Sequence, residues 1–153
     1  MMRWILLLLL LAAGRVQGQE YARTLHTGVL VIGGGTGSSA AAIQSARAGV
    51  PTLLAEPGPM LGGMLTAGGV SCTDGNDQFA SGMWQEFRQA LYQHYGRTKL
   101  NSGWVSNTCF EPHVGDSIFK AWAAKEKKLE VIHGLRFVSV IRDGSRITGA
   151  EFR

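Results

Sequence analysis

The stretch GVLVIGGGTGSSAAAIQSARAGVPTLLAE, residues 28–56, decides the fold. A β-branched apolar run at 27–32 ends in a glycine cluster and predicts a fully buried strand. The small residues of 36–48 stop at Gly49, which is typical of a helix with a glycine C-terminus. The apolar run 52–56 then predicts a second buried strand. Strand, helix and strand within about 30 residues form a βαβ unit, which indicates a parallel sheet with a right-handed crossover.

The glycines between the first strand and the helix, GGGTGS at 33–38, predict a pyrophosphate site. A turn that joins a strand to a helix directs backbone N–H groups and the positive end of the helix dipole toward one point. Gly33 permits the tight turn, and Gly35 lets a phosphate approach the backbone without a Cβ in the way. Ser38 occupies the third position, where a small residue lets the helix and the strand pack closely. A second register of the same pattern, which begins at Gly35, also fits.

Glu56 supports the interpretation as a dinucleotide site. It ends the second predicted strand, 23 residues after Gly33, close to where this fingerprint has an acid that hydrogen-bonds a ribose hydroxyl. An acid there disfavours a 2′-phosphate on that ribose. By itself Glu56 is equally compatible with an exposed carboxylate at a strand end. The fingerprint also does not separate FAD from NAD, since both carry an adenosine diphosphate half.

This part of the chain resembles bacterial FAD-dependent oxidoreductases of the glutathione-reductase-like superfamily. The resemblance also rests on two further segments, LGGMLTAGGVS at 61–71 and SNTCFEPHVGDSIFK at 106–120. The resemblance spans 27–153. Within the superfamily, the chain resembles more narrowly an exported branch whose members are sometimes labelled xanthan lyase. It implies an α/β fold: a Rossmann-like FAD/NAD(P)-binding domain with a parallel central sheet and a β-hairpin or meander at its C-terminal end. It also implies FAD as the cofactor.

The resemblance further implies which residues contact the cofactor. The residues around the pyrophosphate would be Gly33, Gly35, Thr36, Gly37 and Ser38, with Glu56 on the adenosine ribose. Along the ribityl chain near the flavin would lie Gly62, Gly63 and Met64, while the backbone of Val138 would meet the adenine. Ser38 departs from the family's usual glycine, and we expect this change to weaken close packing slightly without abolishing binding.

The first twenty residues, MMRWILLLLLLAAGRVQGQE, predict a secretory signal peptide. The apolar run from Ile5 to Ala13 follows Arg3 and is too short for a membrane span, which needs about 20 residues. Small and apolar side chains before Gln19 favour cleavage there. We therefore expect a signal peptide at 1–18, an exported domain at 19–153 and no stable membrane span after cleavage. The alternative is an uncleaved N-terminal anchor.

The rest of the chain predicts further elements. A long glycine-rich loop covers 57–75, and such loops are usually functional. Apolar residues then recur every four positions and predict an amphipathic helix that ends at Gly96; they are Phe79, Met83, Phe87, Leu91 and Tyr95. Residues 97–110 read as irregular. The remaining predicted elements are a helix from Pro112 to about Lys128, a strand at Leu129–Ile132 and a hairpin over 135–152 joined at Asp143-Gly144.

The composition excludes several classes of protein. The length of 153 residues fits about one domain. The small net charge of +4 argues against a dedicated nucleic-acid binder. Its two cysteines, Cys72 and Cys109, are too few for a disulfide scaffold or a zinc ribbon, and sequence alone does not show whether they reach bridging distance. We find no metal-ligand spacing, paired carboxylates, nucleophile elbow or P-loop lysine, and we assign no catalytic residue or metal ligand.

Two residues near the predicted site have alternative interpretations. Cys72 follows the glycine-rich loop and is a candidate group beside a flavin or substrate, although a small buried thiol is more usual. His113, at the start of a predicted helix, is a candidate on the substrate side, although a surface or core histidine is more usual.

Three functions stay open at this point. The favoured one is the FAD-binding portion of an exported oxidoreductase that acts on a small-molecule or carbohydrate substrate. The others are a polysaccharide lyase or other carbohydrate-processing protein, and a degenerate, non-catalytic dinucleotide-binding fragment. Members of the family continue with a substrate domain, so we expect an incomplete domain that stops at Arg153 before that part.

Overall fold

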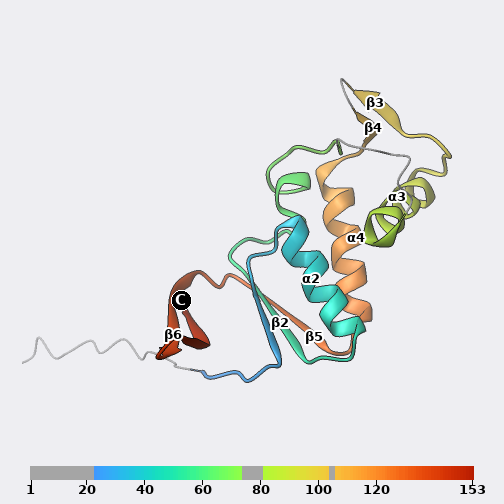
Figure 1. The fold of residues 1–153 in the computed structure, drawn as a ribbon. Helices are drawn as coiled ribbons and strands as arrows, with labels where there is room; N and C mark the ends of the chain where they lie inside the picture. Colours follow the sequence, from blue (N-terminus) through green and yellow to red (C-terminus); the bar gives the residue numbers. More distant parts are fainter. Residues whose placement is uncertain (1–22, 74–80, 104–105) are drawn as a thin grey trace, which may run out of the picture.

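The computed structural model describes residues 23–73, 81–103 and 106–153 (Figure 1). The signal peptide predicted at 1–18 and Phe79 of the predicted helix lie outside these residues. Along the chain the elements are β1 (Val29–Ile32), α2 (Thr36–Arg47), β2 (Thr52–Glu56), the 3₁₀-helix η1 (Gly63–Leu65), α3 (Gly82–Tyr95), β3 (Asn101–Gly103), β4 (Ser106–Cys109), α4 (Pro112–Lys125), β5 (Leu129–His133), β6 (Phe137–Asp143) and β7 (Arg146–Phe152).

A parallel three-stranded sheet with the order β1-β2-β5 forms the centre of the fold. The pairing of β1 with β2 ends at Ile32 and Ala55, and that of β2 with β5 ends at Glu56 and His133. Because the strands are parallel, their carboxyl ends meet at one edge of the sheet. The glycines after β1 and the carboxylate of Glu56 therefore lie at the same edge. The predicted βαβ unit and α/β class are confirmed.

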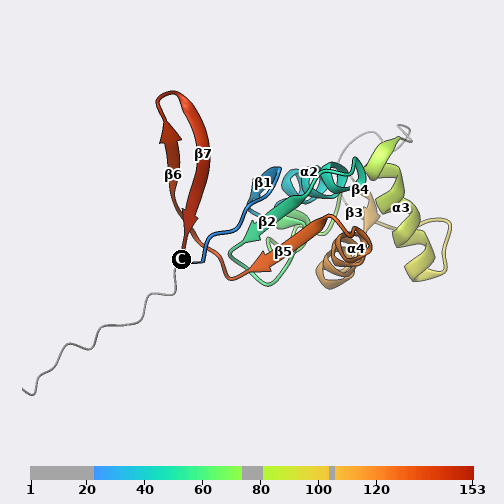
Figure 2. The ribbon, with the colours of Figure 1, turned by 90° about the horizontal axis from the view of Figure 1, so that it is seen from below.

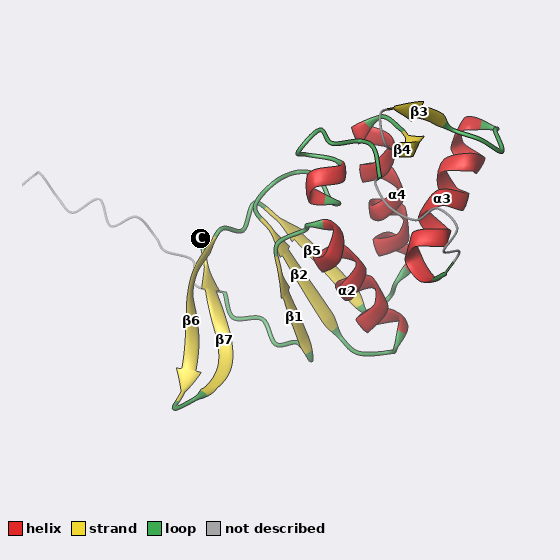
Figure 3. Cartoon of the chain, turned by 45° about the horizontal axis from the view of Figure 1, so that its top comes forward, coloured by secondary structure: helices red, strands yellow, loops and turns green. Residues whose placement is uncertain are grey.

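The helices pack on one side of the sheet, as Figure 3 shows. The buried residues of α2 are mostly small and let this helix approach β1 and β2 closely; they are Ser39, Ala42, Ile43 and Ala46. Between α3 and α4 the core is aromatic. The ring of Phe87 stacks on Phe119 and meets Phe110 edge-on, each at a centroid distance of 5.3 Å. This cluster packs α4 against α3.

The predicted C-terminal hairpin is present and stands apart from the helices (Figures 1 and 2). Strands β6 and β7 are antiparallel and pair from Phe137 and Phe152 to Asp143 and Arg146. The connecting residues are Gly144 and Ser145, with Gly144 at φ +57°, so the turn lies one residue later than predicted.

Three further sequence predictions need correction. Strand β1 is not fully buried: Ile32 is 43% exposed, because among the described residues β1 pairs with β2 alone. Helix α4 ends at Lys125 rather than near Lys128, because Glu126 adopts an extended backbone that directs the chain into β5. The region 97–110 is not irregular, since β3 and β4 pair there. Their residues, NSG and SNTC, lack the apolar alternation that marks a strand, so tertiary pairing sets these strands.

Candidate cofactor-binding site

Two glycine segments that are separate in the sequence lie side by side at the carboxyl edge of the sheet. Gly35 and Gly62 form a parallel bridge, and the N–H of Gly62 donates to the carbonyl oxygen of Gly34 at 2.8 Å. The hydroxyl of Thr36 donates to the carbonyl of Gly62 at 2.7 Å. The structure thus brings together the residues that were predicted to surround the pyrophosphate and those predicted to lie near the flavin.

The close contact requires glycine at several positions. A Cβ at Gly63 would lie 2.8 Å from the Cα of Gly35, and a Cβ at Gly62 would lie 2.9 Å from the ring of Phe119. Gly62 and Gly63 also have φ values of +102° and +54°, which side chains rarely adopt. Gly34, which sequence reasoning did not single out, is buried, and a Cβ there would lie 2.7 Å from Oε2 of Glu56. Gly62 and Gly63 are therefore restricted to bare backbone, and a side chain at Gly34 would displace the carboxylate of Glu56.

Glu56 holds this edge together. Its Oε2 accepts a hydrogen bond from the N–H of Gly34, and its Oε1 accepts one from the N–H of Gly58 at 2.6 Å. An ionised carboxylate has about four acceptor positions, so each oxygen keeps capacity for another donor. The ring nitrogen Nδ1 of His133 lies 2.7 Å from the carbonyl oxygen of Gly58 and links β5 to the same turn. Glu56 is thus both a structural acceptor and a half-buried group that can accept from ribose hydroxyls.

The start of α2 is open. Its N-cap residue is Gly35, no side chain caps the helix, and its first turn contains no acid. A Cβ built at Gly33 or at Gly37 meets no atom within 4 Å. The first N–H groups of a helix have no partner within the helix, and the dipole makes this end positive. An uncapped helix start with open space above two glycines fits the diphosphate of a dinucleotide.

Two residues that sequence reasoning missed support the second glycine segment. Asp116 on α4 accepts the N–H of Leu61 at 2.8 Å and pairs with Lys120 at 2.7 Å. The buried hydroxyl of Thr66 donates to the carbonyl of Leu61 at 2.6 Å. The spacing of Asp116 and Lys120 signals only a helical i,i+4 pair, so the sequence does not reveal the contact with the loop.

The other predicted site residues have exposed side chains. Met64 is 68% exposed on η1, and Val138 is 52% exposed on β6. The hairpin is tied to the site through Leu135, whose N–H donates to the backbone carbonyl of Glu56 at 3.3 Å. His113 is exposed on the first turn of α4. Over the described parts of the chain, no three His, Cys, Asp or Glu residues form a group that could hold a metal ion.

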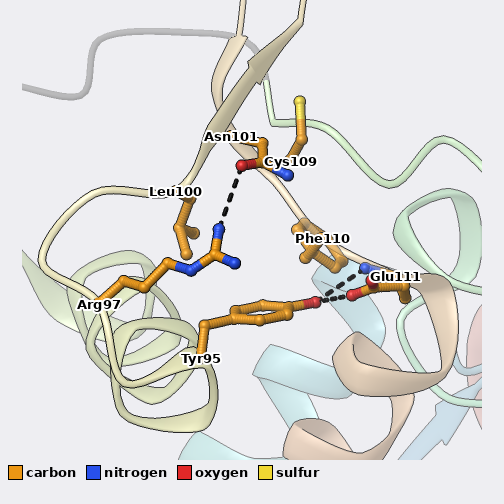
Figure 4. Close-up of a pocket in the computed structure, with 7 residues that line it drawn as sticks. All are labelled: Tyr95, Arg97, Leu100, Asn101, Cys109, Phe110 and Glu111. Carbon is orange, nitrogen blue, oxygen red and sulfur yellow. Dashed lines mark hydrogen bonds between the residues drawn. The ribbon is translucent and has the colours of Figure 1, made fainter.

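A separate cavity of about 220 Å³ lies where α3, β3, β4 and α4 meet (Figure 4). The hydroxyl of Tyr95 donates to the carboxylate of Glu111 and accepts the N–H of Glu111 at 3.1 Å. Arg97 donates to the side-chain oxygen of Asn101 at 3.2 Å. No residue of the two glycine segments lines this cavity. Its polar groups largely satisfy one another.

The comparison with protein families identifies the family of the chain. Residues 28–153 match the family model described as FAD dependent oxidoreductase. The chain belongs to this family. FAD is the cofactor that the family uses, which agrees with the prediction of FAD, and the glycine junction and Glu56 fit such a dinucleotide. No curated protein matches the sequence of the chain.

Solved structures of flavin enzymes share the fold. A flavin-dependent brominase has a TM-score of 0.60 at 18% identity, and a geranylgeranyl bacteriochlorophyll reductase-like protein from Thermoplasma acidophilum has 0.56 at 23%. The myxobacterial chondrochloren halogenase, an FAD-dependent halogenase, has 0.58 at 16%. The match to the brominase covers 84% of this chain and 34% of the brominase. The match to the reductase-like protein covers 82% and 34%, and the match to the halogenase covers 83% and 33%. The Rossmann-like α/β fold is therefore confirmed, and the chain spans about a third of the length of these relatives.

Proposed function

We propose that this chain is the FAD-binding portion of an exported flavin-dependent oxidoreductase. The observation that carries the proposal is the junction of the two glycine segments beside Glu56, at the carboxyl edge of a parallel sheet. In open α/β sheets, ligands bind outside the carboxyl ends of the strands. The bound flavin would supply hydride-transfer chemistry, and this chain would supply binding and orientation.

The pyrophosphate would lie at the start of α2, against the backbone of Gly33, Gly35, Thr36, Gly37 and Ser38. The uncapped N–H groups and the helix dipole favour its negative charge. At Gly33 and Gly37 no atom within 4 Å of a Cβ position obstructs the approach of a phosphate. Ser38 is half-buried, and its small side chain keeps this approach open.

The adenosine ribose would donate its hydroxyls to Glu56, and the backbone of Val138 would meet the adenine. The hydrogen bond between Leu135 and Glu56 supports this placement, because it brings the start of the hairpin to the ribose end of the site. In the other direction Gly62, Gly63 and Met64 would follow the ribityl chain toward the flavin. The exposure of Met64 leaves its side chain available for such a contact.

The finer classification rests on sequence. The segments 61–71 and 106–120 support the glutathione-reductase-like superfamily and its branch sometimes labelled xanthan lyase, and the first eighteen residues support export by a signal peptide. The substrate would be a small molecule or a carbohydrate. In the described residues no helix has the length and apolar character to cross a bilayer.

The proposal is tested by the visible absorption spectrum of the purified chain and by flavin fluorescence after heat release. We expect bound, releasable FAD, and we expect Glu56→Ala to weaken FAD binding about tenfold, since it removes a charged hydrogen-bond acceptor. Glu130→Ala on the neighbouring strand β5 is the matched control, because Glu130 is exposed and lies outside the site. A chain that stays colourless after incubation with FAD would overturn the proposal. Release of unsaturated sugar without flavin would instead support the lyase.

A further inference from the structure

Cys72 and Cys109 face each other across two extended segments. Cys72 follows the second glycine segment, and Cys109 ends β4 just before α4 begins. The two residues form an antiparallel bridge, and their sulfur atoms lie 2.9 Å apart. They are the two cysteines of the whole sequence. The family assignment and the proposed FAD site do not account for this pair.

The backbone geometry suits a disulfide bond. The N–H of Phe110 donates to the carbonyl of Ser71 at 2.9 Å, and the N–H of Thr73 donates to the carbonyl of Thr108 at 3.4 Å. These bonds flank Cys72 and Cys109, so the cysteines occupy a non-hydrogen-bonded pair. The Cα atoms of such a pair lie about 4.5 Å apart and its side chains are close. Disulfides span Cα distances of about 4.4–6.8 Å, so bond formation needs no movement of either strand.

Neighbouring contacts fix this register. The hydroxyls of Thr73 and Thr108 lie 2.5 Å apart, and the hydroxyl of Ser106 donates to the carbonyl of Thr73 at 2.9 Å. Both cysteines are half-buried, so a small disulfide reagent can reach them. Cys109 lines the cavity of Figure 4, but its sulfur points away from the side chains of Arg97 and Tyr95. The orientation therefore favours the partner cysteine over a ligand in that cavity.

We propose that Cys72 and Cys109 are a redox pair that closes into an intramolecular disulfide. Oxidised glutathione, or another disulfide donor, accepts the two electrons. The two thiols lose their protons, one sulfur–sulfur bond forms between the cysteines, and the donor disulfide is reduced to two thiols. The new bond ties the end of the segment that carries Gly62 and Gly63 to the start of α4, where Asp116 already holds Leu61. The pair thus makes the rigidity of the second glycine segment depend on the redox state.

The test is oxidation of the full chain with a glutathione redox buffer, followed by intact mass spectrometry and thermal denaturation. We expect the oxidised chain to lose the mass of two hydrogen atoms, to resist alkylation at both cysteines and to melt about 10 °C above the reduced chain. The matched controls are Cys72→Ser and Cys109→Ser. Each should fold, melt near the reduced parent and show no such shift on oxidation.

Two results would overturn the proposal. One is a parent chain that takes up only glutathione adducts or links to a second chain under oxidising conditions. The other is an intramolecular disulfide that leaves the melting temperature unchanged. None of these readouts needs bound FAD, so failure of the FAD proposal and failure of this one are distinguishable.

Discussion

At Gly63 the chain has no room for a methyl group, and this makes a sharp prediction. A Cβ there would lie 2.8 Å from the Cα of Gly35, which is backbone and cannot rotate away, and φ is +54°. We expect Gly63→Ala to lower the free energy of unfolding by about 1–3 kcal/mol, because the two glycine segments must separate. Urea denaturation of the variant and the parent measures this difference.

Gly37 is the matched control for Gly63, because a Cβ there meets no atom within 4 Å and the residue lies in the first turn of α2. Alanine has the higher helix propensity, so we expect Gly37→Ala to leave stability unchanged or to raise it by up to about 1 kcal/mol. The same variant should bind FAD more weakly if the pyrophosphate lies above this turn. Equal losses of stability in the two variants would contradict the packing described for Gly63.

Single residues could be predicted where their role follows from sequence spacing, and not where it follows from a contact between distant segments. Gly33, Gly35 and Glu56 are defined by their spacing after a strand, and the structure places them at one edge of the sheet. Gly34, Thr66 and Asp116 escaped notice because their contacts depend on how the chain folds back after β2. No local pattern encodes that path. From the sequence alone, Asp116 is indistinguishable from a charged residue on a helix surface, and only the fold shows its contact with Leu61.

At the scale of elements, Arg47 joins three helices. It donates to both carboxylate oxygens of Glu86 on α3, at 3.0 and 2.9 Å, and to Glu126 at the end of α4, at 3.3 Å. The hydrogen bond with Glu86 raises the pKa of the Arg47 guanidinium above its already high ordinary value. Its side chain is 29% exposed, so solvent screens part of the attraction.

We expect Arg47→Met to lower the free energy of unfolding by about 1 kcal/mol, because a bidentate pair is lost at a partly exposed site. Arg142→Met, on the exposed face of the hairpin strand β6, is the control and should change stability by less than about 0.5 kcal/mol. The difference between the two variants should shrink in high salt, which chemical denaturation at two ionic strengths would show. Equal stabilities of the two variants would mean that the network contributes nothing.

The elements that could be predicted are those with a strong local pattern. The βαβ unit, the helix ending at Gly96 and the hairpin each combine an apolar period with a glycine at the turn or the helix end. Strands β3 and β4 have no such pattern. Strand β4 pairs with β3 and also with the segment around Cys72, and the second of these contacts joins distant parts of the chain that no local pattern marks. The end of α4 was misplaced because Lys127 and Lys128 are good helix formers, whereas pairing with β2 requires extended chain.

At the scale of the whole molecule, the sequence predicted a parallel central sheet and a C-terminal hairpin but not where the hairpin lies. The order β1-β2-β5 follows from two successive crossovers in one direction, which parallel pairing and the helix pattern already favour. The position of β6 and β7 depends on the short link through Gly134, Leu135 and Arg136. That link is fixed by the backbone bond from Leu135 to Glu56, a contact between distant segments with no signature in the sequence.

This arrangement predicts two levels of stability within one chain. Strand β2 is flanked by β1 and β5, and its residues Thr52–Ala55 are buried. The hairpin packs chiefly against itself and leaves apolar side chains such as Val138, Val140 and Ile147 exposed. An isolated two-stranded hairpin is marginally stable in water, so β6 and β7 should open without unfolding of the sheet.

Amide hydrogen exchange followed by mass spectrometry measures this difference. We expect the hydrogen-bonded amides of β6 and β7 to exchange at least about 100-fold faster than those of β2, because their opening costs only the hairpin's own contacts. Exchange of both groups at one rate would instead show that the hairpin opens only when the whole chain unfolds.

The backbone hydrogen bond from Leu135 to Glu56 would then be strong enough to couple the hairpin to the central sheet. In that case Glu56→Ala, which keeps the backbone carbonyl, should preserve the coupling even though it removes the hydrogen bonds that the carboxylate accepts from Gly34 and Gly58.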